Sequence, residues 1–316
     1  PKNKREMFGK TRMQFLVVVS MFFMASCDSI YEDLPRCELW LEFTFDHNME
    51  YADAFDPQVN SVDVFVFGDD DKLLLTKRAE PTALVGGNRM SLADELSFGS
   101  YKILTVGSLS DSHRVATHTG QSPILGTTTL QEMVAALYRE VDMIDFQFPH
   151  FYFAPVVQLD HFGTNDAVCR VNLMRYTNRF NIALMRTNGT GDTRYSFEIE
   201  GPVTYRAYHT DWTRSTDVEM VSRLNTMRLF NMAGYRFIIK NEETGVEVWD
   251  YNLMSLLNIA RPTLRPDNTS LPFQEYLDRQ SDWNLVFTVT EKPEGGFLQI
   301  GLVVGPWIYW LHDMEI

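Results

Sequence analysis

The sequence predicts a mainly β protein with two tandem β-sandwich domains and a few short helices. Apolar and polar residues alternate in many short segments, which is typical of half-buried strands. Turns rich in Gly, Pro, Asn and Asp separate these segments. The chain has 316 residues, more than one typical small domain needs. We therefore expect the first sandwich at residues 37–157 and the second at residues 166–316.

The first half contains four segments that we expect to be strands. Residues 37–45 alternate strictly between apolar and polar side chains, and valines recur at every second position of 62–66. The acidic turn at 68–71 joins that segment to 73–76, which predicts a hairpin. Residues 101–106 form a further apolar segment after Gly99.

Residues 129–141 are the best helix candidate of the first half. Thr129 and Glu132 have the spacing of a capping box. Four apolar residues would follow on one helical face, namely Met133, Val134, Leu137 and Val141. We expect this helix to cover a sheet edge or an end of the first sandwich.

Residues 155–166 predict the link between the domains, because Gly163, Asn165 and Asp166 lie close together there. The second half again alternates. The expected strands lie at 171–173, 180–184, 195–199, 237–240, 246–249, 285–289, 298–302 and 307–311. Short helices are expected near 252–257 and 273–277.

The N-terminal 26 residues have the order of a secretory signal of the lipoprotein kind. A basic leader with Lys2 and Arg12 at its ends precedes an uncharged apolar run at 15–23, and Met24-Ala25-Ser26-Cys27 follows. Cleavage before Cys27 would free its thiol for a covalent lipid such as palmitate and its amine for acylation. The alternative is a transmembrane anchor, but the run is short for about 30 Å of hydrocarbon. We expect a lipid tether, followed by an acidic spacer at 27–36.

The charge of the chain excludes some partners. The formal net charge is −14, and the leader contributes five Lys or Arg and one Glu, so the remainder is more acidic still. An acidic surface repels phosphate backbones, which argues against nucleic-acid binding. It also argues against adhesion to anionic lipid through a basic patch, so the covalent lipid would attach the protein to the membrane.

Two cysteines remain besides Cys27, at positions 37 and 169. This is too few for a disulfide framework. One bridge between Cys37 and Cys169 is possible. Both lie in alternating apolar segments, however, which favours buried free thiols.

No catalytic or metal-binding pattern is present in the sequence. It contains neither a Gly-x-Ser-x-Gly elbow nor a His-Glu-x-x-His helix motif. His113 and His118 are five residues apart and would point to different faces. The acidic run 69–71 fits a solvated turn better than a calcium site. We expect no enzyme activity and no cofactor beyond the covalent lipid, and therefore a protein that holds or recognises a partner.

Several segments, each a weak signal alone, occur together over nearly the whole chain after residue 26. They are Cys27-Asp28-Ser29-Ile30-Tyr31-Glu32-Asp33-Leu34, Cys37, Phe43-Thr44-Phe45-Asp46-His47-Asn48, Gly99-Ser100-Tyr101-Lys102, Leu173-Met174-Arg175-Tyr176-Thr177-Asn178-Arg179-Phe180, Thr226-Met227-Arg228-Leu229, Glu275-Tyr276-Leu277-Asp278-Arg279 and the terminal 305–316. In this order they resemble one family, the FimB-type fimbrial anchor lipoproteins of Bacteroidales. The chain departs from the family at Gly305-Pro306-Trp307, where Asn-Gly-Trp is common.

The resemblance implies transthyretin-like sandwiches and a minor subunit at the base of type V pili. Such a subunit would hold the fibre to the outer membrane and would help set fibre length. Its partners would be fimbrial subunits (pilins), joined by strand addition. We expect a lipid-anchored, surface-exposed protein of the outer membrane with a role in cell adhesion.

The resemblance also suggests roles for individual residues. Acidic residues after the cysteine would help sort the lipoprotein to the cell surface, or would only form a spacer; they are Asp28, Glu32 and Asp33. Trp307, Tyr309 and Leu311 could border the pilin-binding edge, or could pack in the core as strand aromatics usually do. The alternative function is a surface lipoprotein that binds glycan or host protein.

Overall fold

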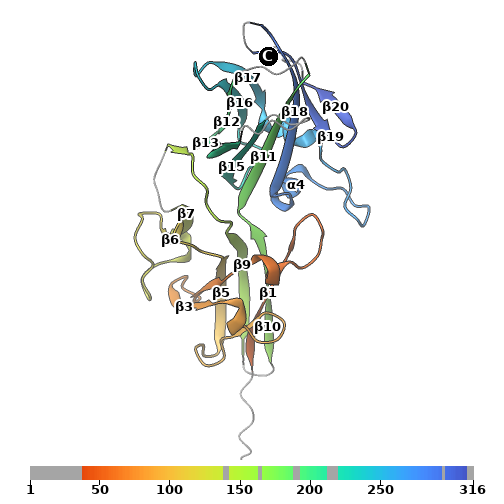
Figure 1. Cartoon of the computed structure of the whole chain (residues 1–316). Coiled ribbons are helices and arrows are strands. Elements are labelled where there is room, and N and C mark those ends of the chain that lie inside the picture. Colours follow the sequence, from red (N-terminus) through yellow and green to blue (C-terminus); the bar gives the residue numbers. More distant parts are fainter. Residues whose placement is uncertain are drawn as a thin grey trace, which may run out of the picture.

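The computed structural model describes residues 38–137, 142–162, 166–187, 193–211, 220–293 and 296–311. It is mainly β, as the sequence predicts, and its strands form two bodies stacked end to end (Figure 1). Each body has its own core of buried apolar side chains. The chain positions 1–37, which include the predicted signal and spacer, lie outside the described residues.

The first body is built on a seven-stranded sheet with the order β3-β2-β5-β9-β10-β1-β4. The strands are β1 (Leu39–His47), β2 (Val62–Phe67), β3 (Leu73–Ala79), β4 (Arg89–Ser91), β5 (Gly99–Gly107), β9 (Tyr152–His161) and β10 (Ala167–Arg175). A short helix α2 (Phe55–Gln58) and a 3-10 turn η1 (Pro81–Ala83) connect them. The predicted alternation in β1 is confirmed, because Leu39, Leu41 and Phe43 all point into the core. β1 pairs in parallel with β10 and antiparallel with β4.

The helix predicted at 129–141 is wrong. The capping box of Thr129 and Glu132 exists, but it opens only a 3-10 turn, η2 (Leu130–Glu132), which leads into strand β7 (Met133–Leu137). β7 pairs with β6 (His113–Thr117) in a separate two-stranded sheet. Met133 and Ala135 pack on a second apolar cluster, whereas Val134 between them is exposed. The side chains from Met133 to Ala135 therefore alternate with the period of a strand. The hairpin of β6 and β7 covers the face of β2 and β5 that carries this second cluster.

The predicted link at 155–166 is also wrong, since β9 occupies most of it. The turn-forming residues near Asp166 belong to the connection between β9 and β10, which both lie in the first sheet. An earlier segment, β8 (Met143–Ile144), already belongs to the second body, because it pairs with β13 (Thr204–Arg206) and its Ile144 is buried in the second core. The chain then forms β9 and β10 in the first sheet and enters the second body again after Tyr176. The predicted strand at 171–173 is therefore part of the first body.

The second body is a sandwich of two sheets. One has the order β14-β15-β11-β18-β19-β20 and the other the order β17-β16-β12-β13-β8. Its strands are β11 (Thr177–Arg186), β12 (Tyr195–Glu200), β13 (Thr204–Arg206), β14 (His209–Asp211), β15 (Met220–Met227), β16 (Arg236–Asn241), β17 (Glu247–Asn252), β18 (Asp282–Glu291), β19 (Phe297–Val304) and β20 (Trp307–Trp310). Phe180 and Phe287 from the first of these sheets meet Phe237 from the other in one core.

Both short helices predicted in the second half are confirmed. α3 (Leu253–Ile259) begins at Asn252, whose side chain accepts a hydrogen bond from the Ser255 backbone N–H at 2.8 Å. α4 (Phe273–Arg279) lies beside the junction of the two bodies (Figure 1). Within the described ranges, no helix combines the length and apolar character needed to cross a bilayer.

Polar contacts fasten the two bodies together. The Arg279 guanidinium of α4 donates from Nη1 to the backbone oxygens of Asp46 and Asn48, each at 3.1 Å, and stacks over the Tyr51 ring. Arg175 at the end of β10 pairs with Asp282 at 2.6 Å. These contacts hold the end of β1 directly against the second body.

Candidate partner-binding edge

The strand β20 forms one edge of the six-stranded sheet. It is joined to β19 by a two-residue loop, in which Gly305 has φ 58° and Pro306 follows. Positive φ at the first loop position and Pro at the second fit a type II′ hairpin turn. β20 therefore folds back tightly on β19, and its other side has no strand partner among the described residues.

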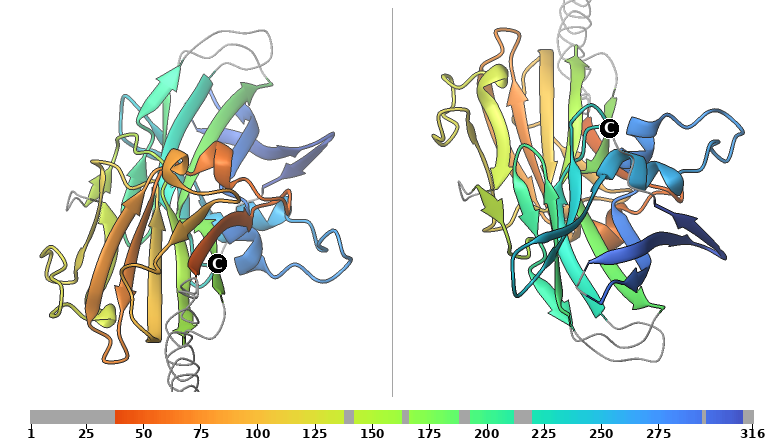
Figure 2. Two further views of the ribbon diagram at one scale, coloured as in Figure 1. Left: turned by 90° about the horizontal axis from the view of Figure 1, so that it is seen from below. Right: turned by 90° about the horizontal axis from the view of Figure 1, so that it is seen from above.

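All four side chains of β20 are exposed. The exposed fraction is 69% for Trp307 and close to half for Ile308, Tyr309 and Trp310. The β19–β20 hairpin, in dark blue, projects from the second body in both views of Figure 2. Core packing therefore does not account for Trp307 and Tyr309. Leu311 differs from them, because it is 6% exposed and belongs to the second core.

The hydrogen-bond register shows which backbone groups of β20 face outward. Leu311 N donates to Ile300 O at 2.9 Å, so the pair 300 and 311 is hydrogen-bonded. Bonded and non-bonded pairs alternate in an antiparallel ladder. The pairs Gly301–Trp310 and Val303–Ile308 are therefore non-bonded, and the N–H groups of Ile308 and Trp310 point away from β19.

Gly301 allows β20 to lie close to β19. A Cβ at this position would lie 2.6 Å from Cγ2 of Ile308 and 3.1 Å from Cε3 of Trp310, well inside normal contact. The side chains of Ile308 and Trp310 therefore occupy the space that a side chain at position 301 would need. Sequence reasoning missed Gly301, Ile308 and Trp310; the signal that could have found them is a lone glycine within an alternating strand.

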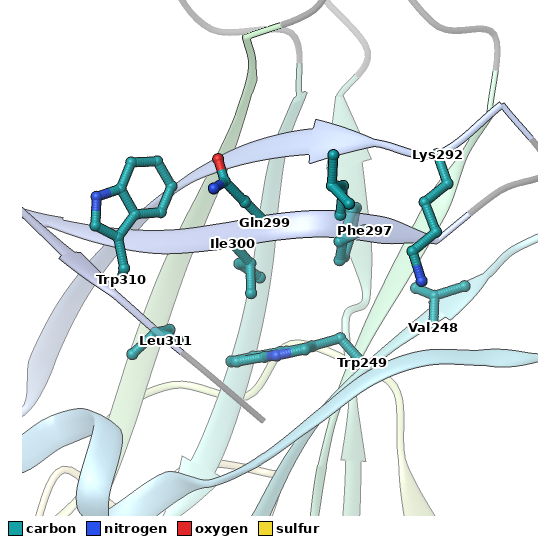
Figure 3. Close-up of a pocket in the computed structure, with 9 residues that line it drawn as sticks. Val248, Trp249, Lys292, Phe297, Gln299, Ile300, Trp310 and Leu311 are labelled. Carbon is teal, nitrogen blue, oxygen red and sulfur yellow. The ribbon is translucent and has the colours of Figure 1, made fainter. Parts of the chain in front are cut away.

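A cavity of about 440 Å³ lies between this hairpin and β17, the edge strand of the other sheet. We call it the edge groove. Its lining residues are Val248, Trp249, Lys292, Phe297, Leu298, Gln299, Ile300, Trp310 and Leu311. Ile300 and Leu311 point toward the Trp249 indole, whereas Gln299 and Trp310 lie on the other face of the hairpin (Figure 3). The sandwich is thus open on the side where its two edge strands face each other.

Contacts with other aromatic rings fix the positions of Trp249 and Phe297 in the wall of the edge groove. Trp249 stacks on Tyr251 with ring centroids 5.3 Å apart, and Phe297 contacts the buried ring of Tyr195 at 5.1 Å. The Tyr195 hydroxyl donates to Glu291 at 2.5 Å, and burial and this carboxylate raise the pKa of Tyr195 above its ordinary value. Nε1 of Trp249 is buried and has no hydrogen-bond partner in the described part of the chain. The groove therefore has a mixed lining, in which Lys292 and Gln299 lie among the aromatic and aliphatic side chains, and Nε1 of Trp249 is a buried donor.

The other predicted site residues lie away from this edge. Cys27, Asp28, Glu32 and Asp33 fall outside the described residues. Cys169 is a half-buried free thiol, and burial raises its pKa, whereas Cys37 also falls outside the described residues. Among the described side chains, no three His, Cys, Asp or Glu residues are grouped so that they could hold a metal ion.

Comparisons with known proteins identify relatives over nearly the whole chain. The profile of a family described as fimbrillin-A associated anchor proteins Mfa1 and Mfa2 matches residues 34–313. No functionally curated protein sequence matches at a significant level.

Solved structures include a similar candidate adhesin from Bacteroides ovatus. It is 59% identical, covers 92% of this chain and 100% of its own, and superposes with a TM-score of 0.86. A candidate polysaccharide-binding protein from Bacteroides thetaiotaomicron is 26% identical over 88% of this chain and 99% of its own, with a TM-score of 0.72. The fimbrial anchor protein Mfa2 from Porphyromonas gingivalis is 15% identical over 88% of this chain and 100% of its own, and its TM-score of 0.60 shows a shared fold.

Proposed function

Because this chain belongs to the family of fimbrillin-A associated anchor proteins, we propose that it is a non-catalytic minor subunit that anchors a fimbria to the outer membrane. Family membership gives the protein a fimbria-associated role at the cell surface. The finer parts of the proposal are the lipid on Cys27, the joint with the fimbrial subunit by strand addition, and an influence on fibre length.

The observation that carries the proposal is the exposed edge strand β20 beside the edge groove. Exposed apolar edge strands are normally protected, because they pair readily with another chain. An added strand would bond to the outward N–H groups of Ile308 and Trp310 and place alternate apolar side chains in the groove. One of its carbonyl groups could accept the unpaired N–H of Trp249.

The two ends of the molecule suit this role. β1 begins at Leu39, at the end of the first body farthest from β20 (Figure 1). A lipid on Cys27 would therefore tether one end while β20 holds the fibre at the other. A subunit with one fibre-binding edge and a tether ends a fibre rather than extending it, so its supply relative to pilin would influence fibre length.

The anchor function is tested by Cys27→Ala in the native host. The expected result is that intact fibres are released into the medium with the unlipidated protein. If the protein becomes soluble while fibres stay on the cells, the anchor proposal fails.

The joint is tested by Ile308→Pro. Proline removes an N–H that faces outward and leaves the β19 ladder intact, which an edge strand tolerates. We expect fibre shedding with Ile308→Pro and retention with the control Ile308→Ala, which keeps that N–H. Equal retention in both variants would contradict strand addition at this edge.

Glycan binding is the second candidate function. Aromatic side chains of Trp249, Phe297 and Trp310 border the edge groove, and sugars bind to such surfaces. The 26% identical relative described as a candidate polysaccharide-binding protein supports the same idea. A glycan site would lose affinity with Trp310→Ala but not with Ile308→Pro, since proline leaves the rings in place.

A further inference from the structure

The end of the first body opposite β20 brings together four strand ends. β5 begins at Gly99 opposite the last residue of β9, His161, and β10 begins at Ala167 beside the first residue of β1, Leu39. Glu38 is fixed there by two hydrogen bonds. Its N–H donates to Asp166 Oδ1 at 2.8 Å, and its backbone oxygen accepts from Ala167 N at 2.9 Å. Glu38, the described residue nearest to Cys27 in the sequence, therefore lies at this end.

Two phenylalanines are exposed at the same end. Phe98 is 69% exposed and Phe162 is 66% exposed, although neither lines the edge groove. They directly precede Gly99 and follow His161, so the antiparallel register of β5 and β9 continues to them and sets them opposite each other. The Phe98 ring also contacts the buried His161 ring, with centroids 5.1 Å apart. The fold thus holds two aromatic side chains at its tip.

We infer that Phe98 and Phe162, which we call the Phe tip, contact the lipid surface to which the chain is tethered. This inference rests on the proposed lipid at Cys27. Ten residues separate Cys27 from Glu38, and that length of chain spans at most about 40 Å even when fully extended. The Phe tip therefore stays close to the bilayer, and aromatic side chains are favoured at the boundary between water and lipid.

The charges around the Phe tip favour zwitterionic lipid. Asp160, Asp166 and Glu38 lie at this end, and they would be repelled by anionic headgroups. Apolar burial of the two rings must supply the attraction. The contact would stand the first body on the membrane and direct β20 away from it (Figure 1).

The contact is tested on the lipidated full chain bound to phosphatidylcholine vesicles with bromine-labelled acyl chains. Phe98→Trp adds a tryptophan at the tip, and Met232→Trp adds one at a position of the second body that is 91% exposed. We expect bromine to quench the added emission with Phe98→Trp and not with Met232→Trp. If vesicle-bound protein shows no quenching with Phe98→Trp, the Phe tip does not touch lipid, even though the tether works.

The unlipidated Cys27→Ser chain tests the Phe tip without the tether. At high vesicle concentration, we expect Phe98→Ser combined with Phe162→Ser to lower the partition coefficient by roughly tenfold. Met232→Ser is the matched control and should leave it unchanged. Equal partitioning of all three proteins would overturn the inference. So would a self-association of the chain that the double substitution abolishes, since the Phe tip would then join two copies.

Discussion

The first strand of the structure, β1, and the last, β20, are protected to opposite degrees. β1 lies between β10 and β4, and its inward side chains are buried. Among the described strands, β20 pairs with β19 alone, and all four of its side chains are exposed. The strand nearest the proposed tether is therefore closed to other chains, whereas the strand at the far end is open. The difference is what the proposed strand addition at β20 requires, since an incoming strand needs an edge with free backbone groups.

Phe43→Ala in β1 should have the largest effect on stability. Phe43 is fully buried and stacks on Phe55 with ring centroids 6.0 Å apart. Its truncation leaves a cavity and should lower the free energy of unfolding by about 3–5 kcal/mol. Chemical denaturation measures this loss. A loss below about 1 kcal/mol would mean that β1 is no better packed than β20.

The junction between the two ends should respond to acid. Burial lowers the pKa of His113 to about 4, and burial with the nearby Arg175 and Arg179 lowers the pKa of His150 to about 3. In the unfolded chain both titrate near pH 6.5, so below that pH the unfolded state binds protons that the folded state does not. This part of the stability is present above pH 6.5 and is lost as the pH falls towards 4.

The expected loss is about 2 kcal/mol per histidine between pH 7 and pH 5. Denaturation at several pH values measures it, and His113→Gln should flatten the dependence because glutamine does not titrate. An unchanged pH dependence in this variant would show that His113 is not the group responsible.

Gly301→Ala should affect β20 more than the rest of the molecule. The added methyl group would overlap Ile308 and Trp310, so the hairpin must shift, at a cost of about 1–3 kcal/mol. We expect faster amide exchange in β20 and fibre shedding. Gly86→Ala is the control, since a Cβ there meets nothing within 4 Å. Native exchange rates in both variants would contradict the close approach of the two strands.

Trp307→Ser should have the smallest effect on stability, within about 0.5 kcal/mol, because the side chain is exposed. Its effect should instead fall on fibre retention in the native host. A large loss of stability with normal fibre retention would contradict the contrast between the buried β1 and the exposed β20, because Trp307 would then stabilise the fold instead of binding a partner.

Much of the fold could be predicted from alternation alone, including β1 and most strands of the second body. The helix predicted at 129–141 is wrong because the same residues fit both a helical and a strand pattern. Met133, Val134 and Leu137 fit a helical face, but pairing with β6 makes this segment a strand, in which Met133 and Ala135 pack inward. The parallel pairing of β1 with β10 joins residues 128 positions apart, such as Leu41 and Cys169, and nothing local signals it.

The candidate site could be predicted only in part. Trp307 and Tyr309 were candidates for a partner-binding edge, and alternation could not distinguish an edge strand from a buried one. Leu311 continues the same alternation, yet it is buried in the second core. The edge groove depends on β17 and β20 both being sheet edges on one side of the sandwich, a property of the whole topology rather than of any segment.

The most direct test of the account is amide hydrogen exchange of β20 with and without the fimbrial subunit. The amides of Ile308 and Trp310 face outward and should exchange fast in the free protein, then slow markedly when a strand is added. The amide of Tyr309, which faces β19, serves as the internal control. Protection of Ile308 and Trp310 in the complex is the predicted result. Unchanged exchange at both amides in a complex that still forms would contradict strand addition at β20.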